Sequence, residues 1–103
     1  MQAPFDPVLS TGGFVADYIN RLPPRVRLRG LVTTILASHT IVRPFSDDDT
    51  LAEVGLASVD MVTLMLAVEN EFNVEIPQSE ITAEVFRSVS TLEDLILRLV
   101  PLA

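Results

Sequence analysis

The chain is short, rich in apolar residues and free of cysteine. Its 103 residues, 49% of them apolar, suffice for one small domain. The absence of cysteine excludes disulfides, thiolate nucleophiles and cysteine-ligated metals. We find neither an apolar run of the ~20 residues that span a bilayer nor the pattern of a signal peptide. These features predict a cytoplasmic protein that does not insert into membranes.

The net charge of −7 is unevenly distributed along the chain. Twelve of the 14 acidic residues, but only two of the seven arginines, follow residue 43. This part of the chain would repel nucleic acid and anionic lipid and would attract basic protein surfaces. An acidic surface also keeps a small domain soluble, so charge by itself does not identify a partner.

The first third of the chain predicts an N-terminal extension followed by one long helix. Apolar residues recur at helical spacing toward the end of residues 1–22. Pro23-Pro24 then begins a helix whose apolar pattern ends near His39. We therefore divide the chain into a partly helical extension, residues 1–22, and a main domain, residues 23–103.

A long polar loop, residues 40–57, separates this helix from the rest. Thr50 and Glu53 have the spacing of a capping box, which predicts one helical turn inside the loop. Three further helices are expected: residues 59–72, residues 83–87 with Thr82 as the cap, and a final helix from the Ser90-Thr91-Leu92-Glu93 capping box to about Val100. The pattern predicts an all-α fold, a small four-helix bundle with a long loop between the first two main helices and an N-terminal helical extension.

The helix expected over residues 59–72 carries two apolar lines. The first line faces the core and consists of Met61, Leu64, Met65, Val68 and Phe72. The second line, formed by Val59, Val62 and Leu66, is rotated away from the first. A helix needs only one apolar face to bury itself. The second line is therefore either covered by another helix or exposed to a partner.

Ser58 stands at the start of this helix, after the turn at Gly55. Serine in this position commonly serves only as an N-cap. The same position also suits a covalently attached phosphate, because unpaired N–H groups and the positive end of the helix dipole lie there. We do not expect Ser58 to be catalytic. The only histidine, His39, ends the preceding helix, and nothing in the pattern brings it near as a base.

Three motifs occur in order around Ser58. They are Leu51-Ala52-Glu53-Val54-Gly55-Leu56 leading to Ser58-Val59-Asp60, then Glu69-Asn70-Glu71-Phe72, and finally Glu75-Ile76-Pro77. With these motifs, residues 50–97 resemble an acyl carrier protein, the family that carries 4′-phosphopantetheine on a serine. The spacing from the serine to the Ile-Pro pair fits the family without a gap, whereas residues 1–43 match only loosely.

The resemblance implies a bundle of acyl-carrier-protein type that acts as a carrier and not as an enzyme. A phosphopantetheinyl transferase would move the 4′-phosphopantetheine arm from coenzyme A to the Ser58 hydroxyl. The thiol of the arm would then hold an acyl or aminoacyl group as a thioester. The implied partners are this transferase, an acyl- or aminoacyl-loading ligase, and downstream acyltransferases or synthases. We expect a monomer without a metal site.

The helix after Ser58 departs from the family pattern. Ala57 and Val59 replace the usual Asp and Leu beside the serine, and Thr63 and Asn70 stand where the family often has Glu. The resemblance places the partner-docking face on Val59, Asp60, Val62, Thr63, Leu66 and Glu69. This face is more apolar than that of a fatty-acid carrier. Fatty acids, unusual acyl or polyketide chains and single amino acids all stay open as cargo, and the altered face favours a specialised acyl or aminoacyl group.

The alternative is a degenerate carrier-like bundle that binds proteins without the arm. Ala57 supports this alternative, because the Asp that it replaces carries a charge that transferases commonly recognise. An autonomous hydrolase is not expected, since the chain has one histidine, no cysteine and no nucleophile elbow.

Overall fold

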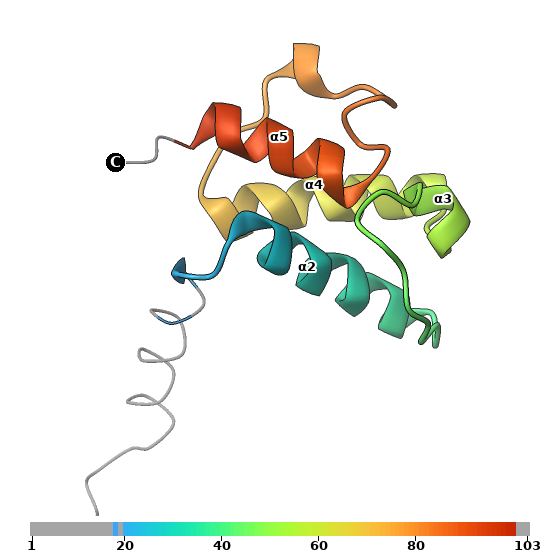
Figure 1. Cartoon of the computed structure of the whole chain (residues 1–103). Coiled ribbons are helices and arrows are strands. Elements are labelled where there is room, and N and C mark those ends of the chain that lie inside the picture. The colour runs from blue at the N-terminus through green and yellow to red at the C-terminus, as the bar shows by residue number, and fades with distance from the viewer. Residues whose placement is uncertain (1–17, 19, 101–103) are drawn as a thin grey trace, which may run out of the picture.

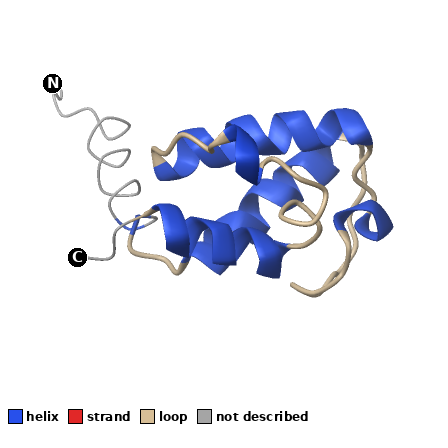
Figure 2. Ribbon diagram, turned by 90° about the horizontal axis from the view of Figure 1, so that it is seen from above, coloured by secondary structure: helices blue, strands red, loops and turns tan. Residues whose placement is uncertain are grey.

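Three long helices and one short helix make up the described part of the chain in the computed structural model (Figure 1). The structure describes residues 18 and 20–100. The helices are α2 (Pro24–Ser38), α3 (Leu51–Val54), α4 (Ser58–Phe72) and α5 (Val89–Leu99), with a 3₁₀ turn, η1, over Gln78–Glu80. These residues contain no strand (Figure 2). The expected all-α bundle, with its long loop between the first two main helices, is confirmed.

Helix α2 begins and ends where the sequence predicts. Pro24 is its first residue, a position where the missing N–H of proline costs nothing. Leu28 and Val32, one turn apart, are fully buried. The helix ends at Ser38 with His39 as its C-cap, and Thr40 then takes a left-handed backbone with φ 58°. The chain thereby turns away from the helix axis into the long loop.

The single helical turn predicted inside the loop is present as α3. The Thr50 hydroxyl accepts the Glu53 N–H at 3.2 Å, and the Glu53 carboxylate accepts the Thr50 N–H at 3.4 Å. The turn ends at Gly55, whose φ of 131° favours glycine. A Cβ atom at Gly55 would also lie 3.1 Å from Cδ1 of Ile41. Glycine at this position therefore allows the tight turn that connects α3 to α4.

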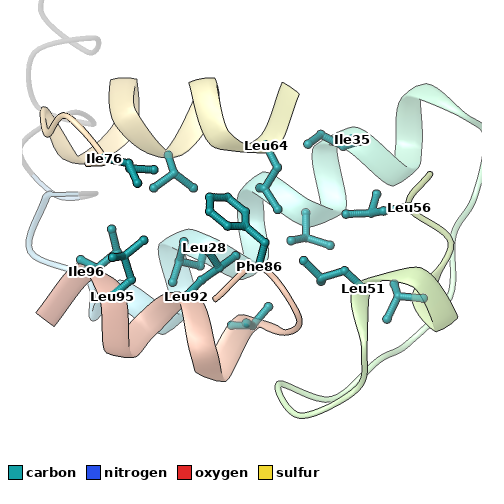
Figure 3. Close-up of a cluster of buried hydrophobic side chains, with 14 of the residues drawn as sticks. Leu28, Ile35, Leu51, Leu56, Leu64, Ile76, Phe86, Leu92, Leu95 and Ile96 are labelled. Carbon is teal, nitrogen blue, oxygen red and sulfur yellow. The ribbon is translucent and has the colours of Figure 1, made fainter. Parts of the chain in front are cut away.

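The core lies where α2 packs against both α4 and α5. Figure 3 shows Leu28 of α2, Leu64 of α4 and Leu92 of α5 converging, with the ring of Phe86 among them. The three leucines are fully buried, and Phe86 is 7% exposed. Phe86 comes from the segment between η1 and α5, so this connection closes one side of the core.

Arginines of α2 connect this helix to its acidic neighbours. Arg27 pairs with Glu71 of α4 at 2.9 Å and stacks over the ring of Phe72 at 4.3 Å. Arg29 pairs with Asp47 of the long loop at 2.7 Å. The excess of positive charge near the N-terminus of the sequence is thus largely met by carboxylates within the fold.

The final helix begins one residue before the predicted capping box. Its cap is Ser88, whose hydroxyl accepts the Thr91 N–H at 3.2 Å, and Val89 is the first helical residue. The predicted cap, Ser90, donates its hydroxyl to the Asp48 carboxylate at 2.7 Å instead. The Ser90 side chain, which the local pattern assigned to capping, therefore bonds to the long loop.

The prediction of a short helix over residues 83–87 is wrong. Thr82 does accept the Val85 N–H at 3.1 Å, as expected of a cap, but only a turn follows. The Arg87 carbonyl at the end of this turn accepts the N–H of Leu51, the first residue of α3, at 2.8 Å. The 3₁₀ turn η1, which the sequence did not indicate, precedes this segment.

The N-terminal extension lies mostly outside the described residues. Tyr18 and Asn20 are helical, whereas the rest of the predicted apolar pattern before Asn20 falls on residues that are not described. The domain boundary at residue 22, the cytoplasmic location and the monomeric state stay predictions. Among the described helices, none has the length and apolar character that crossing a membrane requires.

The two apolar lines of α4 predict opposite responses to truncation. Leu64 is fully buried and Leu66 is 55% exposed. We expect Leu64→Ala to lower the free energy of unfolding by about 2–5 kcal/mol through lost burial and a cavity. Leu66→Ala should change it by about 0.5 kcal/mol or less. Urea unfolding followed by circular dichroism measures both, and equal losses would contradict the assignment of the second line to the surface.

Candidate functional site

Ser58 is the first residue of α4, and its exposed hydroxyl is free of hydrogen bonds within the described chain. Its side chain lies at the surface. Within the part of the chain that the structure describes, the hydroxyl makes no hydrogen bond, and the N–H groups of Ser58 and Val59 have no acceptor. An oxygen atom beside open amides at the positive end of a helix is accessible to a reacting group and suits a product that carries negative charge.

Ser58 is not the N-cap, so the structural role that the sequence offered for it is wrong. The N-cap is Ala57, whose extended backbone has ψ 172° and whose methyl group cannot accept a hydrogen bond. Asp60 takes over part of the capping role, because its Oδ2 atom accepts the Ala57 N–H at 2.8 Å. This arrangement satisfies one open amide and leaves the serine oxygen free.

His39 lies next to this site, contrary to the expectation from the sequence. Its Nε2 atom is 2.8 Å from Oδ1 of Asp60. The imidazole makes no hydrogen bond to Ser58 in the described chain. The histidine therefore does not act as a base on the serine here, and the site lacks the serine–base pair that nucleophilic catalysis requires.

Asp60 is buried and does not belong to the outward face on which the sequence placed it. Only 6% of the residue is exposed. Its pKa lies below the ordinary value, because the hydrogen bonds from His39 and from the Ala57 N–H favour the charged form more than burial opposes it. Its carboxylate is therefore a structural anion, and the prediction that it docks partners directly needs correction.

The second apolar line of α4 is exposed, which resolves the choice that the sequence left open. Val59 is 70% exposed, Val62 56% and Leu66 55%. Thr63 of the same helix is exposed as well. No other described helix covers these side chains, so they form an apolar surface strip that begins immediately after Ser58.

Glu69, the last residue of the predicted docking face, has an internal contact. Its Oε2 atom accepts the Ile76 N–H at 2.9 Å. Glu69 is only partly exposed, and Ile76 is 4% exposed. The carboxylate therefore holds the chain as it leaves α4, which lets the Ile-Pro segment close the core.

An apolar groove of about 420 Å³ runs beside α4, and the sequence did not reveal it. Met61, Val62 and Met65 line it from α4, and Ile81 and Phe86 line it from the opposite segment. Met61 and Met65 were predicted as core. They are partly buried, packing against the core while also lining the groove.

No group of acidic or histidine side chains among the described residues has an arrangement that holds a metal ion.

Comparison with known proteins identifies the kind of site. Residues 27–96 match the family model described as "Phosphopantetheine attachment site". The chain belongs to this carrier family. Members carry covalently attached 4′-phosphopantetheine and are not themselves enzymes. The residues present fit that group, because the exposed Ser58 hydroxyl is unbonded and lies beside free amides.

Relatives and solved structures agree with the family. The carrier is 48% identical over 73 residues to Aminoacyl carrier protein 1 of Bradyrhizobium diazoefficiens, covering 71% of this chain and 81% of the relative. It is 42% identical over 71 residues to Aminoacyl carrier protein 2 of the same organism, covering 69% and 80%.

The fold matches chains in two crystal structures of a ligase complex. One is Bradyrhizobium japonicum glycine:[carrier protein] ligase complexed with glycylated carrier protein, with a TM-score of 0.66, 40% identity, and coverage of 70% of this chain and 96% of that chain. The other contains the ligase with its cognate carrier protein and an analogue of glycyl adenylate, with a TM-score of 0.68, 39% identity, and coverage of 73% and 96%. The expected acyl-carrier-protein type of bundle is confirmed.

The contacts of Asp60 predict how stability depends on pH. The folded pKa is below the unfolded value of about 3.9. The carboxylate therefore stabilises the carrier above that pH, and this contribution disappears as pH falls through the lower folded pKa. We expect Asp60→Asn to be less stable than wild type at pH 7 and nearly equal to it at the lowest pH at which both fold.

Urea unfolding at neutral and acidic pH measures this difference. Asp94→Asn is the control, because Asp94 is exposed and has no hydrogen bond or ion pair in the described chain. This control should change stability little at either pH. A stability difference for Asp60→Asn that is the same at both pH values would show that the ionised carboxylate does not matter.

Proposed function

We propose that Ser58 is the residue that holds the 4′-phosphopantetheine arm. The observation that supports this role is the exposed serine hydroxyl without a hydrogen bond at the start of α4, inside the matched region 27–96. In the attachment reaction the Ser58 oxygen forms a bond to the pantetheine-linked phosphorus of coenzyme A, the P–O bond of the pyrophosphate breaks, and adenosine 3′,5′-bisphosphate leaves. The proton of the hydroxyl passes to a base of the transferase, because no base of this chain is bonded to Ser58.

The start of α4 favours the charge of the attached group. A phosphodiester beside the free N–H groups of Ser58 and Val59 is stabilised by these donors and by the helix dipole. When attached, 4′-phosphopantetheine supplies the thiol that this cysteine-free chain lacks, so that cargo is held as a thioester. The carrier contributes the attachment point and the surface that partners recognise.

The cargo that we propose is an amino acid. Both curated relatives, at 48% and 42% identity, are named aminoacyl carrier proteins. The matching crystal structures concern a glycine:[carrier protein] ligase and its carrier protein. Fatty acid biosynthesis, one of the pathways considered from the sequence, has no support among these relatives. A small amino acid also needs no large interior cavity for its storage.

We propose that the loading ligase docks on the apolar strip of α4, formed by Val59, Val62 and Leu66, with Thr63 beside it. The strip is exposed and begins next to the attachment serine, so a partner seated on it reaches the arm. Burial of an apolar strip by a partner supplies affinity, and the acidic surface of the chain contributes longer-range attraction to a basic partner.

The attachment site is tested by intact mass. Full-length apo protein is incubated with coenzyme A, Mg²⁺ and a promiscuous phosphopantetheinyl transferase. We expect wild type to gain the mass of one phosphopantetheine group and Ser58→Ala to gain none. Because Ser58 makes no side-chain bond, the variant should fold like wild type. No gain on wild type would favour the degenerate bundle without an arm, and an equal gain on Ser58→Ala would place the arm on another residue.

The docking strip is tested by ATP-dependent loading of the modified carrier by the Bradyrhizobium japonicum ligase with glycine. We expect Val62→Asp and Leu66→Asp to raise KM by about 10-fold or more, because a charge at a buried apolar contact is costly, while helicity stays unchanged. The control is Val26→Asp, an exposed apolar position on α2, which should load like wild type.

Two outcomes would contradict this assignment. Unchanged loading of Val62→Asp and Leu66→Asp would move the docking surface elsewhere. No loading of wild type with glycine or with any other amino acid would contradict the aminoacyl cargo.

A further inference from the structure

The Asp60 carboxylate joins two segments that are distant in the sequence. Its Oδ2 atom accepts the Ala57 N–H at 2.8 Å, and its Oδ1 atom lies 2.8 Å from Nε2 of His39 at the end of α2. We propose that this contact, the His39–Asp60 clasp, positions Ser58 for attachment of the arm. Asp60 and His39 are then positioning residues for that reaction. The inference rests on the proposed role of Ser58.

Residue Ala57, which precedes Ser58, is held to Asp60 by two bonds, and one of them belongs to the clasp: the Ala57 carbonyl accepts the Asp60 backbone N–H at 3.0 Å, and the Ala57 N–H donates to the Asp60 carboxylate. The N–H group of Leu56, two residues before Ser58, donates to the Leu51 carbonyl at 3.0 Å and so belongs to the end of α3. The next N–H, that of Ala57, has the Asp60 carboxylate as its acceptor. The methyl side chain of Ala57 offers no further contact by hydrogen bonding. The carboxylate therefore fixes the Leu56–Ala57 peptide, while the backbone bond from Asp60 fixes the Ala57 carbonyl, and together they set the orientation of the chain at Ser58.

His39 extends this anchor to the core. Its backbone N–H donates to the carbonyl of Leu36, a core residue that is 2% exposed, at 3.0 Å. An ionised carboxylate can only accept, so Nε2 of His39 carries the proton of the bond to Asp60. The imidazole thereby holds the carboxylate against the end of α2. Without it, Asp60 loses one of its two partners and gains rotational freedom.

Ser58 itself takes no part in the clasp, since its hydroxyl has no hydrogen bond in the described chain. Disturbing the clasp therefore displaces the serine oxygen without removing it. A displacement of about 1 Å in a reacting group lowers the rate by up to about 100-fold. The expected effect is thus a lower kcat of the transferase, with a smaller change in KM, because the exposed side chains around Ser58 on α4 are unchanged.

The test measures transferase kinetics on the full-length apo chain at saturating coenzyme A, with the carrier concentration varied. We expect Asp60→Ala and His39→Ala to lower kcat by about 10-fold or more. His39→Gln should stay within about 3-fold of wild type, because the glutamine amide can donate to Asp60 as the imidazole does.

The control is Ser88→Ala, which removes the cap of α5 far along the chain from Ser58. The Ser88 hydroxyl accepts the Thr91 N–H at 3.2 Å, so this variant also loses a helix cap. Its kcat should equal that of wild type. A fall in kcat as large as that of His39→Ala would mean that general destabilisation lowers the rate, and this result would overturn the clasp.

Wild-type kcat for folded Asp60→Ala and His39→Ala would also overturn the clasp. If Asp60→Ala does not fold, the comparison of kcat between His39→Ala and His39→Gln tests the proposal. These variants should fold, because the His39 side chain is 46% exposed and its removal leaves no cavity. A loss of rate with both His39 variants would deny a hydrogen-bonding role. The proposed function fails separately, by absence of modification on wild type or by modification of Ser58→Ala.

Discussion

Burial of one face of α4 against its neighbours is the interaction on which the functional surface depends. Leu64 and Val68 are fully buried on that face, and α4 packs directly on α2. Side chains project around the whole circumference of a helix, so fixing this face turns Val59, Val62 and Leu66 toward solvent. The first residue of the same helix, Ser58, is exposed. The packing that stabilises the bundle therefore also exposes Ser58 and the apolar strip on the same helix.

Several carboxylates of this acidic chain act within the fold. Asp60 holds the entry to α4, Glu69 holds the exit from it, and Glu71 pairs with Arg27 of α2. Asp47 of the long loop pairs with Arg29. These bonds explain how a carrier with a net charge of −7 presents a largely apolar strip on its recognition helix. Under the proposed function, partner recognition relies on apolar contact near the serine, with the remaining acidic surface acting over a longer distance.

The sequence predicted the long helices well because their signals are local. Apolar periodicity identified α2 and α4, Pro23-Pro24 marked the start of α2, and the Thr50 capping box was correct. The errors lie where a distant segment competes for the same group. Ser90 bonds to Asp48 and does not cap α5. The Arg87 carbonyl bonds to the Leu51 N–H of α3, and residues 83–87 form a turn in place of the predicted helix.

The sequence by itself identified the proposed attachment serine, the family and the amphipathic helix that follows the serine, because a motif and a 3.6-residue period are properties of neighbouring residues. Only the tertiary structure decided that the second apolar line is exposed, that Asp60 is buried, and that His39 reaches it. His39 and Asp60 are 21 positions apart, and their contact depends on how α2 and α4 pack. Packing direction comes from the whole core, and no local pattern of residues encodes it.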